Sequence, residues 1–158
     1  MIIIAHRGNL DGPNSNENSP TQIDTAIQQN FDCEIDLWEI DQYLYLGHDF
    51  GMYKVTLDWI LARKDKLWIH CKNYSCLKLF MSLESLGLNF FWHQNDDYTL
   101  TSKKKIWVYP GQILLDGSIA VLPENFTENE NSNLLSRCFA ICTDFALEYR
   151  RKYSSGAC

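Results

Sequence analysis

Side chains that could do chemistry stand at the ends of several short apolar runs of this 158-residue chain. His6 and Arg7 directly follow the run Ile2–Ala5. Further along, His70 and Lys72 end a second run, and their spacing puts both on one face of a strand. The other two histidines of the chain occupy similar positions: His48 and His93. Histidines beside an arginine, a lysine and carboxylates suit a site for a phosphate and a divalent cation.

Glu34 and Asp36 form the most informative pair of carboxylates. Alternation places both on one face of an expected strand at 33–38, whose other face is apolar. Two buried carboxylates repel each other unless a positive group lies between them. A metal ion meets that need, and so could Arg7 or Lys72. Alternatively, the strand lies at the edge of the sheet and both carboxylates are in water.

The rest of the chain predicts an α/β fold with a largely parallel sheet. Apolar runs predict strands at 2–5, 33–38, 43–46, 67–71, 89–92, 106–109, 118–122 and 139–142. Helices are predicted at 20–29, 57–63, 75–86 and 145–153. Because parallel strands end at one rim, the polar groups would converge there. Taken singly, His93 or Asp144 at such an end is more often only solvated or hydrogen-bonded.

The order of these residues resembles the signature of the glycerophosphodiester phosphodiesterase family. The matching motifs are His6-Arg7-Gly8, Glu17-Asn18-Ser19, Glu34-Ile35-Asp36 and His48-Asp49. Two later segments, "LWIHCK" and "AICTDFAL", resemble further strands of the same family. The resemblance implies a TIM-barrel fold and hydrolysis of phosphodiesters with a bound Mg²⁺ or Ca²⁺ ion.

The resemblance also implies a role for each matched residue. His6 and His48 would be the general acid and base, and Arg7 and Lys72 would bind the phosphate. The implied metal ligands are Glu34, Asp36 and His70. The residues expected to orient these groups are Glu17, Asn18 and Asp49. His70 stands where the family has a carboxylate, which shifts the expected metal towards Mn²⁺ or Zn²⁺.

The chain is short for the implied fold. An eight-stranded barrel usually needs roughly 250 residues, and this single domain, 1–158, has far fewer. We therefore expect a reduced or distorted TIM-type parallel β/α barrel with fewer than eight regular βα units. Asp116-Gly117 indicates a hairpin turn that would pair 113–115 with 118–122.

The segment 90–111 has no counterpart in the family signature and mixes aromatic with polar residues. Trp92, His93 and Tyr109 are candidates for a subsite that holds a sugar or a headgroup. Alternatively, the aromatic side chains belong to the core and the polar ones to a surface loop. The expected function is metal-dependent hydrolysis of a glycerophosphodiester-like small molecule. The alternatives are a phosphodiesterase or phospholipase-like enzyme for another sugar-phosphate or lipid headgroup, and a phosphate-binding module without turnover.

Composition narrows the range of partners. A net charge of -6 and a pI near 5.1 argue against nucleic-acid binding. No run approaches the roughly 18 apolar residues of a membrane span, so membrane insertion is not expected. The start of the chain lacks the pattern of a signal peptide, and the six cysteines form no C-x-x-C pair. We expect reduced, buried thiols, a cytoplasmic location and a small-molecule substrate. The sequence does not indicate an oligomeric state.

Overall fold

The computed structural model describes residues 1–126 and 132–154, and a sheet of ten strands runs through them. The strands are β1 (Ile2–Ala5), β2 (Asp32–Ile40), β3 (Tyr43–Leu46), β4 (Tyr53–Val55), β5 (Leu67–Cys71), β6 (Phe90–Phe91), β7 (Tyr98–Leu100), β8 (Ile106–Val108), β9 (Ile119–Val121) and β10 (Ala140–Thr143). Seven of them run parallel in the order β6-β5-β2-β1-β10-β9-β8. The strands β3, β4 and β7 add antiparallel pairs at the sides.

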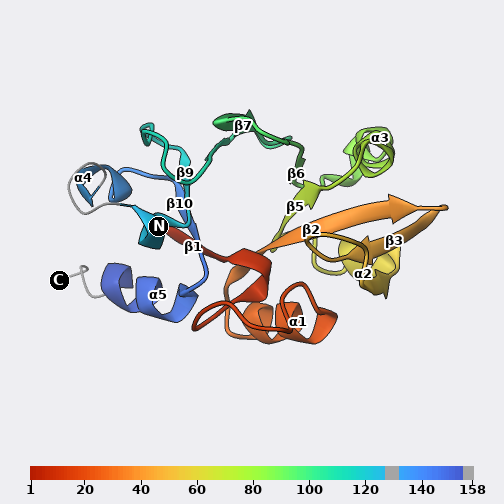
Figure 1. The fold of residues 1–158 in the computed structure, drawn as a ribbon, viewed down its shortest axis with the longest axis horizontal. Coiled ribbons are helices and arrows are strands. Elements are labelled where there is room, and N and C mark those ends of the chain that lie inside the picture. The colour runs from red at the N-terminus through yellow and green to blue at the C-terminus, as the bar shows by residue number, and fades with distance from the viewer. Residues whose placement is uncertain (127–131, 155–158) are drawn as a thin grey trace.

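The helices are few and short. They are α1 (Pro20–Gln28), α2 (Leu57–Leu61), α3 (Tyr74–Ser82), α4 (Ser132–Leu135) and α5 (Ala146–Ser154). Three 3₁₀ turns, η1 (His6–Gly8), η2 (Glu84–Leu86) and η3 (Pro123–Asn125), complete the described elements. Side-chain oxygens of Ser19, Thr56 and Asn73 accept hydrogen bonds from backbone N–H groups and begin α1, α2 and α3. The helices lie on the outer side of the curved sheet (Figure 1).

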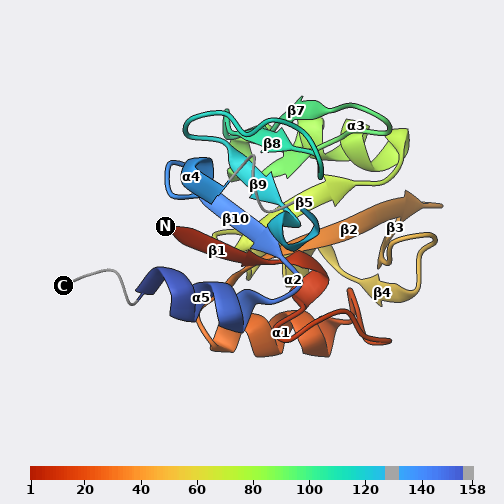
Figure 2. The same cartoon turned by 60° about the vertical axis from the view of Figure 1, so that its left-hand side comes forward.

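The expectation of an α/β, TIM-type parallel β/α barrel was wrong. The sheet is mixed and curls into a half-barrel (Figures 1 and 2), and no strand pairing in the described ranges joins β6 to β7 or β8. The chain after β2 turns back into the antiparallel pair β3–β4 instead of entering a helix. From β6 to β9 the described chain forms no α-helix at all.

The segment between β6 and β9 explains this departure. Its strands have two or three residues each, and turns near Lys104, Pro110 and Gly117 separate them. Such short connections leave no room for the helical crossover that usually joins parallel strands. The turn at Asp116-Gly117 is present, since Ser118 N donates to Leu115 O at 3.0 Å. The hairpin predicted there was wrong, because β9 pairs in parallel with β8 and β10.

Two layers of apolar side chains cover the two faces of the sheet. The outer layer packs the helices on the sheet and includes Ile3, Ala5 and Ile35. The inner layer fills the concave side: Ile4, Trp68, Phe91, Trp107, Ile119, Val121, Ala140 and Cys142. Alternation along each strand therefore decides which side chains face the interior of the curve. Polar residues take the inward positions in β2 and at the carboxyl ends of β1 and β5.

Two of the sequence expectations concern the whole chain. The cysteines in the described part of the chain, Cys33, Cys71, Cys76, Cys138 and Cys142, are free and buried, and Cys158 lies outside that part. Within the described ranges, no helix has the length and apolar character required to cross a membrane.

Candidate active site

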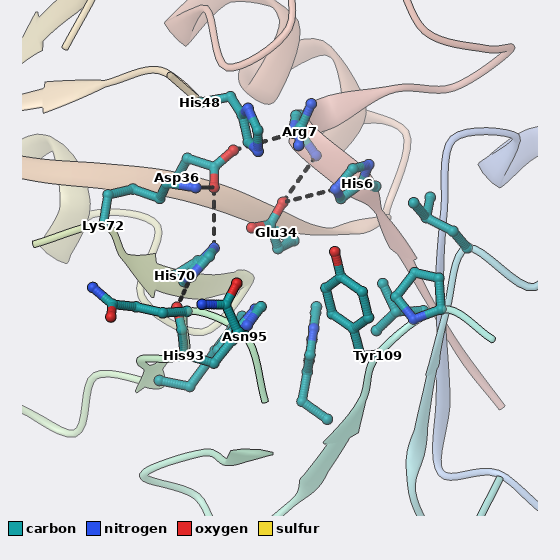
Figure 3. A pocket seen from close by; sticks show the side chains of 16 residues that line it. His6, Arg7, Glu34, Asp36, His48, His70, Lys72, His93, Asn95 and Tyr109 are labelled. Atoms are coloured by element: carbon teal, nitrogen blue, oxygen red, sulfur yellow. Dashed lines mark hydrogen bonds and ion pairs between the residues drawn. The ribbon is translucent and has the colours of Figure 1, made fainter. Parts of the chain in front are cut away.

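A cleft opens at the carboxyl ends of the parallel strands, on the concave side of the sheet (Figure 3). Its volume of about 420 Å³ lies within the roughly 300–1,000 Å³ that is usual for small-molecule pockets. The residues that line it are His6, Arg7, Glu34, Asp36, His48, His70, Lys72, Phe91, His93, Gln94, Asn95, Trp107, Tyr109, Pro110, Val121 and Leu122. The cleft is therefore larger than a phosphate group needs.

Most of the residues that the sequence singled out meet at this cleft. All of the expected acid–base, phosphate-binding and metal-binding residues line it, together with His93 and Tyr109. Behind them, Glu17 hydrogen-bonds to Arg7, Asn18 to Asp36, and Asp49 to His48. Trp92 is not among the described residues that line the cleft, because the alternation that turns Phe91 and His93 inward turns Trp92 outward.

The first and last strands of the sheet bring His6 and Asp144 together. β1 pairs with β10 so that Ala5 lies opposite Thr143. The next residue of each chain segment, His6 and Asp144, therefore lies close to the other. His6 Nδ1 lies 2.8 Å from Asp144 Oδ1, and His6 Nε2 lies 3.9 Å from Glu34 Oε2. Burial lowers the pKa of His6, but the hydrogen bond to Asp144 and the charge of Glu34 outweigh it and raise that pKa. An aspartate thus orients His6 and stabilises its protonated form.

Asp144 is itself held in place by groups that the sequence did not single out. Asn9 Nδ2 donates to Asp144 Oδ1 at 2.8 Å, and Glu124 Oε1 accepts from the Asp144 N–H at 2.8 Å. Glu124 also accepts from the hydroxyl of Thr143. The pKa of Asp144 is lowered despite its burial, chiefly by the hydrogen bond and charge of His6. The Thr143-Asp144 pair at a strand end was the available signal, whereas Asn9 and Glu124 had none.

Asp36 contacts two cations and a histidine at once. Its Oδ1 lies 3.1 Å from His70 Nδ1 and 3.2 Å from Lys72 Nζ, and its Oδ2 lies 3.1 Å from Arg7 Nε. Asn18 Nδ2 donates to Oδ2 at 3.0 Å. Asp36 is 1% exposed, and burial would raise its pKa, but the hydrogen bond from His70 and the charges of Lys72 and Arg7 hold that pKa well below its usual range. The carboxylate is the anchor that keeps these cations at the cleft.

Arg7 reaches the cleft from a strained backbone. Its φ is +52°, a conformation that non-glycine residues seldom adopt. Nη1 donates to Glu17 at 3.0 Å, while Nε, although close to Asp36, has no well-aligned hydrogen-bond acceptor among the described residues. Strain of this kind is often found at functional sites. The guanidinium therefore keeps donor capacity for a bound anion.

Glu34 lies beside Asp36, but its pKa is shifted in the opposite direction. Burial and the charge of Asp36 raise the pKa of Glu34. Its Oε2 accepts a long hydrogen bond, 3.3 Å, from the backbone N–H of Arg7. β2 has β1 and β5 on its two sides, so the alternative of an edge strand with solvated carboxylates is excluded. Arg7 and Lys72 lie beside this pair of carboxylates, within ion-pair distance of Asp36.

The spacing of Glu34, Asp36 and His70 fits a divalent cation. One ligand atom from each lies within 4.8 Å of the other two, and β2 and β5 place Asp36 directly opposite His70. Two carboxylates and an imidazole are donors that Mn²⁺ and Zn²⁺ accept readily. The imidazole is held rigidly, since it stacks on Phe91 at 5.1 Å and on His93 at 4.5 Å. Ligation through Nδ1 would replace the hydrogen bond to Asp36.

His48 approaches the cleft on the loop after β3. Its Nδ1 lies 2.7 Å from Asp49 Oδ1, so this histidine also has an aspartate partner. The preceding Gly47 is fixed by its N–H, which donates to Asp36 O at 3.1 Å, and by its carbonyl, which accepts from Trp38 Nε1. The side chain of His48 is 44% exposed, compared with 12% for His6. Figure 3 shows both imidazoles beside Arg7.

The opposite side of the cleft is aromatic and uncharged. Phe91 stacks on Trp107 at 4.5 Å, and His93 makes an edge contact with Tyr109 at 5.7 Å. Burial and the charge of His70 lower the pKa of His93 to about 4, so its ring is neutral near pH 7. The cleft thus has a charged wall and a neutral wall that face each other.

Comparison of the chain with protein-family models, with curated proteins and with solved structures found no match.

Proposed function

We propose that this chain hydrolyses small phosphodiesters in the cleft, as the resemblance to glycerophosphodiester phosphodiesterases implies. One observation carries the proposal. His6 and His48 line the same cleft, and each has its Nδ1 on an aspartate oxygen, at 2.8 Å and 2.7 Å. A histidine held in this way presents Nε2 for proton transfer, and a phosphodiester needs two such groups.

The phosphate is proposed to lie between Arg7 and Lys72. Each keeps N–H donors that Asp36 does not use, and a guanidinium and an ammonium together neutralise the charge that grows on phosphoryl oxygens. Asp36 holds both groups in position before the substrate arrives. Their binding function would therefore require no rearrangement during the reaction.

His6 is assigned as the general acid and His48 as the general base. The raised pKa of His6 keeps its proton available near neutral pH. His48 would take the proton from the attacking hydroxyl, and His6 would give its proton to the departing alkoxide. Where the substrate carries a hydroxyl next to the ester, that hydroxyl would attack phosphorus and form a cyclic phosphate. Water would then open the ring, with the two histidines in exchanged roles.

A divalent cation is proposed at Glu34, Asp36 and His70, with Mg²⁺ or Ca²⁺ implied by the resemblance and Mn²⁺ or Zn²⁺ favoured by the imidazole. Such an ion, when bound, would draw negative charge from the phosphoryl oxygens. The neighbouring Arg7 and Lys72 already supply positive charge to the same place.

The test is a panel of glycerophosphodiesters and bis(4-nitrophenyl) phosphate, assayed in EDTA and then in Mg²⁺, Ca²⁺ and Mn²⁺. We expect hydrolysis that falls by about 10²–10⁴-fold in His6→Gln and in His48→Gln. Asp65→Asn, which alters an exposed carboxylate outside the cleft, is the control and should keep full activity. Full activity in either histidine variant would overturn the proposal. Phosphate binding without turnover of any diester would indicate a binding module instead.

A further inference from the structure

The two walls of the cleft indicate the chemical class of the second alcohol in the phosphodiester substrate. Every charged side chain that lines the cleft, and every histidine except His93, comes from β2, from the carboxyl ends of β1 and β5 or from the loop after β3. The wall from β6, β8 and β9 holds aromatic, aliphatic and amide groups: Phe91, His93, Gln94, Asn95, Trp107, Tyr109, Pro110, Val121 and Leu122. If the phosphate lies at the charged wall, one of its ester groups must lie against the neutral wall.

Tyr109 is the most accessible ring of the neutral wall. Its side chain is 47% exposed, and its hydroxyl points across the cavity towards the charged wall (Figure 3). The ring is supported by the edge contact with His93, which is stacked on His70. Phe91 and Trp107 continue the wall as a stacked and almost fully buried pair. The result is a rigid aromatic surface against which the apolar face of a ring can pack.

Hydrogen-bonding groups stand beside this aromatic surface without partners. In the described ranges, 1–126 and 132–154, the side-chain amides of Gln94 and Asn95 have no hydrogen-bond partner, and His93 Nδ1 is buried without one. Figure 3 shows the Asn95 amide directed into the cavity. Amides and a neutral imidazole both donate and accept, which suits hydroxyl groups.

We infer, on the basis of the proposed function, that the cleft binds a phosphodiester whose second alcohol is a sugar. A sugar ring has an apolar C–H face for Tyr109 and hydroxyls at its rim for Gln94, Asn95 and His93. The cleft volume of about 420 Å³ has room for a phosphate together with such a ring.

Other alcohols suit the neutral wall less well. A cationic headgroup is held by several exposed aromatic faces or by a carboxylate. Among the described residues that line the cleft, Phe91 and Trp107 are almost fully buried, and the carboxylates, Glu34 and Asp36, lie on the charged wall. A fatty acyl chain would cover the exposed amides of Gln94 and Asn95 and leave them unsatisfied, which costs free energy for each group. A glycerol has hydroxyls but no ring face to pack on Tyr109.

The test compares the binding of four probes by titration calorimetry: inorganic phosphate, glycerol 3-phosphate, glucose 1-phosphate and 1-acyl-glycerol 3-phosphate. We expect glucose 1-phosphate to bind at least about tenfold more tightly than glycerol 3-phosphate. Tyr109→Ala and Asn95→Ala should each remove about fivefold or more of the affinity for glucose 1-phosphate and leave that for inorganic phosphate within about twofold. Tyr74→Ala removes an exposed tyrosine outside the cleft and is the matched control.

Equal affinities for glucose 1-phosphate and glycerol 3-phosphate would overturn the inference, as would tighter binding of the acyl compound. The affinities for adenosine 5′-phosphate and ribose 5-phosphate should also be compared. Much tighter binding of adenosine 5′-phosphate would assign the neutral wall to a nucleobase instead of a sugar. The comparison uses binding alone. A chain that selects glucose 1-phosphate but hydrolyses no diester would support the sugar subsite and overturn the proposed hydrolysis.

Discussion

His6 Nδ1 lies 2.8 Å from Asp144 Oδ1, although 138 positions separate the two residues in the chain. The parallel pairing of β1 with β10 creates this contact, because it sets Ala5 opposite Thr143. The first and last strands thus bring one histidine–aspartate pair together. The proposed acid at the beginning of the chain depends on a carboxylate near its other end.

Asp144→Asn should therefore impair proton transfer by His6 and leave phosphate binding in the cleft intact. The charge of Asp144 raises the pKa of His6, so its removal lowers that pKa. If His6 is the acid, the alkaline limb of the pH–rate profile moves to lower pH, and kcat at pH 8 falls by about tenfold or more. The affinity for inorganic phosphate should be unchanged. An unshifted profile with normal kcat would show that Asp144 has only a structural role.

Asp36→Asn and Glu34→Gln should differ sharply in stability. Asp36, itself buried, is the carboxylate partner of Arg7 Nε and Lys72 Nζ, and its loss takes this partner from two partly buried cations, at a cost of about 3–5 kcal/mol. Glu34 makes a weaker contact, 3.9 Å to His6 Nε2, and burial disfavours its charge and raises its pKa, so an isosteric amide should cost less, on the order of 1 kcal/mol. Urea unfolding at pH 7 measures both. Equal losses of unfolding free energy in the two variants would contradict the opposite pKa shifts of the two carboxylates.

Much of the candidate site could be predicted from the sequence because its signals are local. Glu34 and Asp36 are two positions apart within one expected strand, and His70 and Lys72 are two apart at the end of another, so alternation alone puts each pair on one face. The structure places all four at the cleft. The same rule, applied to Trp92, would have turned it away from His93.

The remaining features depend on pairings between distant segments. Asp144 gains its importance only from the contact of β1 with β10, and Glu124 only from its contacts with the end of β10. Eight of the ten strands lie where apolar runs predicted them, whereas β4 and β7 were not predicted. The order in which neighbouring strands pair could not be predicted from these runs either. Whether a short run pairs with its neighbour or crosses over is decided by turns and by the sheet as a whole.

Divalent cations should stabilise the folded chain through Glu34, Asp36 and His70. Binding at a hundredfold excess over Kd adds about 2.7 kcal/mol, and each kcal/mol raises Tm by about 2–4 °C for a chain of this length. We expect a rise of several degrees in MnCl₂ that EDTA reverses. His70→Leu should abolish the rise, whereas His48→Leu, outside the cluster, should keep it. No rise at millimolar MnCl₂ would leave Arg7 and Lys72 as the positive charges of the site.

Gly47→Ala should disturb His48 through the backbone. Gly47 has a φ of +145°, and a Cβ there would meet the carbonyl oxygen of Phe50 well inside van der Waals contact. We expect a loss of more than about 2 kcal/mol in unfolding free energy, together with reduced kcat, since the loop that presents His48 must move.

Gly117→Ala is the matched control: its φ is +73°, but a Cβ meets nothing within 4 Å. That change should cost about 1–2 kcal/mol from the left-handed backbone alone and leave kcat unchanged. Similar losses of stability and activity in the two variants would show that the contact with Phe50 does not set the position of His48.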